Sequence, residues 1–157
     1  MNLTSIHQRY QHALPSVQSL TLLFVRVTCG WNFFLAGKGK LAHIEATTEF
    51  FASLSLPAPH AHAVLIGSLE MVGGLLLLSG LFTRAIAVPL AATMIVDYAT
   101  AHREEGFLSL SDFTDQAPFS FLVACMIAIA FGAGRFSVDQ YLQPWIAKTY
   151  RTASIAS

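Results

Sequence analysis

Two charged residues lie deep within apolar stretches of this sequence, where ionised side chains are unusual. Arg26 is found in LLFVRVTCGW, and Glu70 follows in LEMVGGLLLLSG. An unpaired charge at the centre of a bilayer costs roughly 2.5 to 3.5 kcal/mol on insertion scales, so such groups usually find a partner or face a cavity. Counted from the facing ends of their predicted helices, both come out roughly 14 to 15 Å deep at about 1.5 Å per residue. We therefore expect Arg26 and Glu70 to form an intramembrane charge pair.

The residues around Glu70 favour a close contact between the two helices that carry this pair. Four residues share one face of the predicted helix: Ala63, Gly67, Glu70 and Gly74. Three of them are small, which lets a neighbouring helix approach closely. The charge pair could simply lock the two helices together. Alternatively, Arg26 or Glu70 also binds a polar headgroup or relays protons from a cavity between the helices.

A further carboxylate, Asp97, lies in MIVDYATAHREE near the outer end of the third predicted helix. At this position the side chain can reach water or pair with Arg103. The alternative is a site for headgroup binding or proton entry, formed by Asp97 with Tyr98 and His102. This second role would be needed if a quinone headgroup docked at this edge of the protein.

The cysteines and histidines are the other groups that could do redox or metal chemistry. Cys29 and Cys125 each lie seven residues from one end of a predicted helix, at a similar depth if these helices are neighbours. Thiolates are disfavoured there, so we expect both to pack as small hydrophobic side chains. Four histidines are predicted on the outer face: His43, His60, His62 and His102. No two of them have the i, i+4 spacing that puts two ligands on one helix face, so we expect no metal site.

The sequence contains no motif for soluble enzyme chemistry. It lacks a phosphate-binding loop, the G-x-S-x-G and H-E-x-x-H motifs, the dinucleotide fingerprint and C-x-x-C. Catalytic residues therefore stay unassigned.

Long apolar helices must position these residues, and the sequence predicts four of them. A membrane-spanning helix needs about 20 mostly apolar residues. The predicted spans are residues 17–36, 61–82, 84–101 and 118–134. Between the first two, IEATTEFFASLSL alternates apolar and polar residues, which predicts a short amphipathic helix on the outer interface, stopped by Pro57 and Pro59.

The overall composition is that of an integral membrane protein. Of the 157 residues, 54% are hydrophobic and 11% are charged, and the mean hydropathy is +0.56. So few polar side chains cannot coat a soluble globule around four apolar helices. We predict one all-α domain over residues 1–157, an antiparallel four-helix bundle in the membrane. The net charge of zero gives no indication of nucleic-acid binding.

The cations outside the predicted spans indicate the orientation in the membrane. Four crossings place both termini on one side, where five cations fall: Arg9, Arg84, Arg135, Lys148 and Arg151. Three fall on the opposite side: Lys38, Lys40 and Arg103. The positive-inside rule therefore predicts that both termini are cytoplasmic. The first span is too long for a signal peptide and contains Arg26, so we expect it to stay in the protein.

Four segments follow one another in an order that can be compared with known membrane proteins. They are GWNFFLAGKGK behind Arg26, then FFASLSLPAP, LEMVGGLLLLSGLFTR and PFSFLVACMIAIAFGAGRFSVD. Together, over about residues 20–140, they resemble the DoxX family of small four-helix membrane proteins. This resemblance implies a bundle in the inner (plasma) membrane. Some members are the membrane subunit of a thiosulfate:quinone oxidoreductase or accompany thiol and oxidative-stress enzymes. The residues matching the family pattern are Arg26, Glu70, Gly73 and Gly74, but the family supplies no agreed catalytic residue.

Two classes of function fit these observations. In the first, the protein is an accessory or anchoring subunit linked to quinone or thiol redox metabolism, with a peripheral or membrane redox enzyme as its partner. This class predicts a pocket that reaches Glu70. In the second, the protein is a non-catalytic structural subunit or a small-molecule carrier, and the charge pair only sets the register of two helices. This class predicts a dry, closed bundle.

Overall fold

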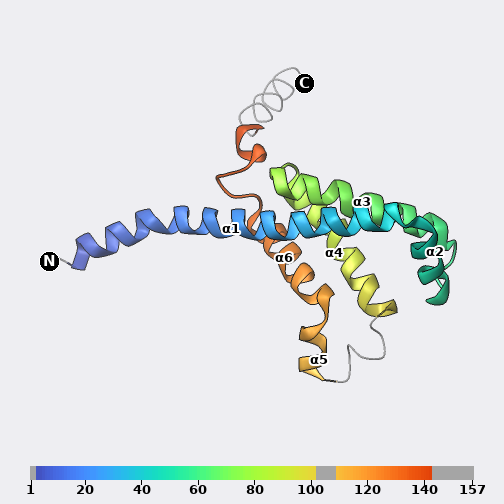
Figure 1. Cartoon of the computed structure of the whole chain (residues 1–157). Helices are drawn as coiled ribbons and strands as arrows, with labels where there is room; N and C mark the ends of the chain where they lie inside the picture. The colour runs from blue at the N-terminus through green and yellow to red at the C-terminus, as the bar shows by residue number, and fades with distance from the viewer. Residues whose placement is uncertain (1–2, 102–108, 143–157) are drawn as a thin grey trace, which may run out of the picture.

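The computed structural model of the chain describes residues 3–101 and 109–142, and this part of the chain is helical without any strand. Six helices follow one another (Figure 1): α1 Leu3–Ala42, α2 Ile44–Ser53, α3 Pro59–Ser79, α4 Thr83–Thr100, α5 Leu110–Asp115 and α6 Ala117–Phe131. Residues 138–142 form one more helical turn. The all-α prediction is confirmed for these residues.

Two of the described helices are long and apolar enough to cross a membrane. They are the segment Leu14–Ala42 of α1 and the whole of α3, Pro59–Ser79. Helix α6 is apolar but has 15 residues, about 22 Å, which is less than the hydrocarbon thickness of about 30 Å. It ends at Phe131 rather than at the predicted residue 134 because Gly132 takes a left-handed φ of 74° at the C-cap. Two of the four predicted spans are therefore supported by length and composition.

Helix α1 is much longer than the span predicted from the sequence. It has 40 residues and contains Pro15, and it continues through the lysines and glycines that follow residue 36. At 1.5 Å per residue its length is about 60 Å, roughly twice the hydrocarbon thickness. Figure 1 shows its N-terminal half extending well beyond the helices that pack around its C-terminal half.

Helices α1 and α3 pack against each other through glycines. A Cβ atom added at Gly37 would meet the backbone of Gly67, Glu70 and Met71, and one added at Gly74 would meet the backbone of Gly30 and Phe34. The two helices are thus in backbone contact, as the predicted stripe of small residues requires. Because the later glycine of α1 faces the earlier one of α3, the two helices run in opposite directions.

Helix α2 confirms the short helix predicted between the first two spans. It buries Phe51 and leaves Phe50 49% exposed. The turn after α2 uses left-handed backbone at Ser55 and Ala58, and Pro59 then occupies the first turn of α3, where its missing N–H costs no hydrogen bond. The place of α2 on the membrane interface stays a prediction.

The core lies where α4 and α6 pack against the α1–α3 pair. Its buried residues are Phe33, Leu77, Ala87, Leu90, Ala91, Met94, Cys125 and Ala128. Much apolar surface remains outside it: Phe24, Leu65 and Met126 are 71%, 64% and 61% exposed. Large exposed apolar side chains on three helices are typical of a protein whose outer surface contacts lipid.

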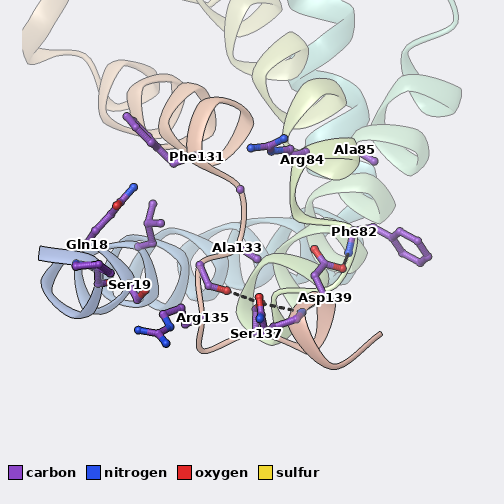
Figure 2. A pocket seen from close by; sticks show the side chains of 15 residues that line it. Gln18, Ser19, Phe82, Arg84, Ala85, Phe131, Ala133, Arg135, Ser137 and Asp139 are labelled. Carbon is purple, nitrogen blue, oxygen red and sulfur yellow. Dashed lines mark hydrogen bonds between the residues drawn. The ribbon is translucent and has the colours of Figure 1, made fainter. Parts of the chain in front are cut away.

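The segment that follows α6, residues 132–142, folds back over the ends of other helices; we call it the return segment. Its Asp139 binds the start of α4, where the backbone N–H of Phe82 donates to Oδ1 at 2.8 Å and that of Thr83 donates to Oδ2 at 3.1 Å. The Asp139 N–H donates in turn to the carbonyl of Gly80 at 3.0 Å. Figure 2 shows Asp139 beside Phe82. Asp139 therefore ties the return segment to α4 through its carboxylate and to the end of α3 through its backbone N–H.

We expect Asp139→Ala to lower the free energy of unfolding by about 1 to 2 kcal/mol, as the loss of other helix caps does. Asp139→Asn should recover part of this loss because its amide oxygen can still accept one of the two bonds. The measurement is unfolding by sodium dodecyl sulfate in mixed micelles. Asp115→Ala, which removes an exposed carboxylate from α5, is the control and should stay within about 0.5 kcal/mol of the wild type. Equal losses for the two alanine variants would contradict the capping role.

Candidate functional site

Arg26 is buried at the middle of α1 and binds the return segment, not a carboxylate. Its side chain is 3% exposed. Nη1 donates to the carbonyl of Ala133 at 2.5 Å, and Nη2 donates to the carbonyl of Phe136 at 2.7 Å. Gly80 leaves room for the guanidinium, since a Cβ added there would strike Arg26. Arg26 therefore holds the return segment, which directly follows α6, against α1.

Glu70 has a different partner from the one predicted. It is 2% exposed, and its Oε2 accepts a hydrogen bond from Nζ of Lys40 in a salt bridge between α1 and α3. The predicted pairing of Glu70 with Arg26 is wrong. Glu70 does pair with a cation, but this cation comes from the end of α1, beyond the span predicted for residues 17–36.

The register of the two helices explains the error. Gly30 faces Gly74, so Arg26 lies one turn beyond that crossing and Glu70 one turn before it. The two charges are then separated by about eight residue levels, or about 12 Å along the helices. The depth calculation had ended α1 at residue 36, six residues before its actual end at Ala42. Because the end of α1 was placed too early, Arg26 and Glu70 came out at the same depth in the prediction.

A cavity of about 90 Å³ opens beside the Lys40–Glu70 pair; we call it the Glu70 cavity. Helices α2, α3 and α4 enclose it together with the end of α1. Its polar side is formed by Lys40, Glu70, Thr93, Asp97 and Thr100. Its apolar side is formed by Phe50, Phe51, Leu54, Leu56, Ile66, Met94 and Val96. A few convergent polar groups in an otherwise apolar hollow are what a binding site for a small amphiphilic molecule requires.

The second predicted site is partly brought together. Asp97 lines the Glu70 cavity, whereas the buried Tyr98 points to the opposite side of α4, where its hydroxyl donates to the carbonyl of Phe113 at 2.6 Å. The rings of Tyr98 and Phe113 stack at 4.6 Å. Tyr98 thus anchors α5 to α4. His102 and Arg103 lie outside the described residues.

The two cysteines line one small hollow between α1, α3 and α6, together with Arg26 and Leu77. Both are free thiols, and Cys125 is buried. Helices α1 and α6 are neighbours at this hollow, and Cys29 and Cys125 lie at a similar depth, as expected for that case. Among the residues that the structure describes, no three of histidine, cysteine, aspartate and glutamate gather as a metal ion would require.

Two functional features escaped the sequence analysis. Lys40 falls outside the predicted first span, although GKGK is followed by LAHIE without a proline that would end α1 before it. The partners of Arg26 are backbone carbonyls. Because every residue has a carbonyl, the sequence does not indicate which ones Arg26 binds. The one available signal was the pair of glycines in FGAG, Gly132 and Gly134, which both take left-handed backbone and turn the chain back.

Long apolar helices, exposed apolar side chains and buried, paired charges define this chain as a helical membrane protein. The sequence profile of the DoxX family matches residues 21–103. The chain belongs to the DoxX family of membrane proteins.

Three relatives give the range of similarity. CatD of Bacillus subtilis (strain 168), which is named "putative oxidoreductase", is 30% identical over 86% of this chain and 93% of its own length. An uncharacterized membrane protein of Mycobacterium tuberculosis is 34% identical over 78% of this chain and 81% of its own. The inner membrane protein YphA of Escherichia coli (strain K12) is 29% identical over 46% of this chain and 52% of its own. No solved structure is significantly similar to the chain.

Proposed function

We propose that this protein is an accessory subunit of a quinone-linked redox system in the inner membrane and that the Glu70 cavity receives the quinone headgroup. In this proposal the chain crosses the membrane four times as an antiparallel bundle, with both termini in the cytoplasm. A peripheral or membrane redox enzyme, as partner, supplies the electrons. The chain itself binds the headgroup and carries protons to it.

The observation that carries this proposal is the polar wall of the Glu70 cavity. Reduction of a quinone to a quinol consumes two electrons and two protons, so a quinone site needs a cation to polarise a carbonyl oxygen and a group that can pass on protons. Lys40 and Glu70 are such a pair, and Asp97 is a second carboxylate in the lining of the cavity. Ionisable groups that face a cavity inside a membrane protein are a standard mark of proton pathways.

Two relatives agree with the proposed setting. CatD is named an oxidoreductase, and YphA is named an inner membrane protein. The excess of cations at the end that carries Arg84 and Arg135 favours a cytoplasmic position for that end. The Glu70 cavity then opens toward the outer side of the membrane.

The size of the cavity sets a condition on binding. At about 90 Å³ it is smaller than the roughly 150 Å³ cavity that holds benzene in an engineered apolar core. A quinone ring can enter only when side chains of α2 move outward. Helix α2 is ten residues long, and its Phe50 is half exposed, so we expect α2 to act as the movable wall.

The second class of function is favoured by one observation, the position of the salt bridge. Lys40 and Glu70 join α1 to α3, and a pair in this place stabilises the helix contact whether or not a ligand binds. If that is its whole role, replacing both residues together with methionine removes both charges and leaves the fold and every binding property unchanged.

The test is binding of a short-chain quinone, ubiquinone-1, to the purified protein in lipid nanodiscs, followed by isothermal titration calorimetry. We expect the wild type to bind and Glu70→Gln to bind at least about tenfold more weakly, the loss typical of one buried charge-assisted contact. Glu49→Gln is the matched control, because Glu49 is an exposed carboxylate on α2 that does not line the cavity. It should bind like the wild type.

If Glu70→Gln does not fold, a second variant tests whether the quinone binds in the Glu70 cavity. Thr93→Ile fills the cavity from α4 without changing any charge, and we expect it to abolish binding while the protein stays folded. A wild type that does not bind ubiquinone-1, or a Thr93→Ile variant that binds it normally, would overturn the quinone site.

A further inference from the structure

A second and much larger cleft lies at the other end of the molecule; we call it the Arg84 cleft. Its volume is about 580 Å³, and it is formed by α1, the start of α4, the end of α6 and the return segment (Figure 2). Leu22 on its wall is 18 residues before Lys40, which places the two cavities about 27 Å apart along α1. The two sites are therefore separate.

Two arginines line the Arg84 cleft from different sides. Arg84 comes from the start of α4 and lies at the end of α6, and Arg135 comes from the return segment (Figure 2). Arg84 donates one hydrogen bond, from Nη2 to the carbonyl of Ala130 at 3.2 Å. Within the part of the chain that the structure describes, Arg135 has no hydrogen-bond partner. A guanidinium carries five donors, so most of the donors at this cleft are available to a ligand.

The carboxylate at the cleft does not neutralise these arginines. Both oxygens of Asp139 accept backbone N–H groups at the start of α4. Arg26 adds a third cation beneath the return segment. Among the described residues around the return segment, three guanidinium groups thus stand against one carboxylate. The excess of positive charge selects for an anionic ligand.

The remaining lining of the cleft fits an amphiphilic anion. Pro15, Leu22 and Phe131 contribute apolar side chains to the lining, and the amide side chain of Gln18 extends from α1 (Figure 2). The first span predicted from the sequence begins at residue 17, so the cleft, which is lined by Pro15 to Leu22 of α1, lies where that helix is expected to enter the hydrocarbon layer. This is the level of the phosphate groups of a bilayer, and basic pockets between helices at this level bind anionic headgroups.

We propose that the Arg84 cleft binds a phosphate ester, held by Arg84 and attracted by Arg135 from the other side of the cleft. The same chemistry is present in an anionic phospholipid headgroup and in a soluble phosphate ester. This site does not depend on the quinone proposal, since it shares no residue with the Glu70 cavity.

The test uses the full-length protein in nanodiscs of phosphatidylcholine, alone or with phosphatidylglycerol added, and native mass spectrometry to count the retained phosphatidylglycerol. We expect the wild type to retain it and to unfold at a higher temperature when it is present. Arg84→Gln and Arg135→Gln should each weaken retention about fivefold, the equivalent of roughly 1 kcal/mol per cation near an anionic headgroup. Both arginines are exposed, so these variants should fold.

The controls separate the source of the ligand from the charge itself. Lys38→Gln removes an exposed cation from the far end of α1 and should retain the lipid like the wild type, while Arg84→Lys should retain part of the binding. In nanodiscs of phosphatidylcholine alone, glycerol 3-phosphate is the soluble probe. Its stabilisation of the wild type but not of Arg84→Gln, without retention of phosphatidylglycerol, would support the phosphate site with a soluble ligand. No effect of either probe, or the same effect in Arg84→Gln, would overturn the site.

Discussion

Arg26→Met is expected to lower the free energy of unfolding by about 3 to 5 kcal/mol, because it removes two charge-assisted hydrogen bonds at once. The carbonyls of Ala133 and Phe136, which accept these bonds at 2.5 and 2.7 Å, are left without a donor. Ala133 is buried, so water does not readily replace the donor that its carbonyl loses, and an unpaired buried acceptor is costly. The return segment should then separate from α1 while the α1–α3 contact survives.

Two measurements check this expectation. Unfolding by sodium dodecyl sulfate in mixed micelles gives the loss of stability, and hydrogen exchange followed by mass spectrometry locates it. Exchange should rise in residues 132–142 and stay unchanged in α2. Arg26→Lys keeps the charge, but an ammonium group does not have the forked donors that reach both carbonyls, so we expect an intermediate loss of stability.

Lys38→Met is the matched control for Arg26→Met. It removes an exposed cation from the same helix and should change stability by less than about 0.5 kcal/mol. If the stability of Arg26→Met were within about 0.5 kcal/mol of the wild type, the two carbonyls would have other donors. The role of Arg26 in holding the return segment on α1 would then be wrong.

The features that the sequence predicted well depend on local spacing. The small residues around Glu70 repeat with the period of a helix, and they do meet α1 at Gly30 and Gly37. The short helix before Pro57 and Pro59 was also predictable: Pro57 keeps the residue before it out of a helix, α2 ends at Ser53, and Pro59 occupies the first turn of α3. The family assignment rests on the order of several such local patterns along the chain.

The partners of the two buried charges could not be predicted, because they depend on where helices end and how far they slide. Six extra residues at the end of α1 brought Lys40 rather than Arg26 to Glu70. The carbonyls that bind Arg26 become available only because Gly132 and Gly134 turn the chain. A rule that seeks one opposite charge for each buried charge has no means of finding a backbone partner.

The charges and the glycines act at different places along the same helix contact. Arg26 and Lys40 lie toward the two ends of the section of α1 that packs on α3, and the glycines lie between them. The glycines set how close the two backbones come. At one end Arg26 binds the return segment. At the other end Lys40 pairs with Glu70 in the lining of the Glu70 cavity.

Gly37→Ala is therefore expected to cost at least about 3 kcal/mol of stability, at or above the upper end of the range for overpacked cores. The added methyl group would fall within 3 Å of backbone atoms of Gly67, Glu70 and Met71, and a backbone cannot rotate away as a side chain can. The helices must separate, and the geometry of the Lys40–Glu70 bridge changes with them. Quinone binding, if Glu70 carries it, should fall in the same variant.

Gly39→Ala provides the control two residues along the same helix. A Cβ atom there meets nothing within 4 Å, so the methyl group is free to point outward. Alanine is the better helix former by about 1 kcal/mol, and this variant should be as stable as the wild type or slightly more so. Detergent unfolding of the pair gives the result directly. Equal stabilities of Gly37→Ala and Gly39→Ala would mean that α1 and α3 are not in backbone contact, because the two changes add the same atom to the same helix and differ only in what that atom faces.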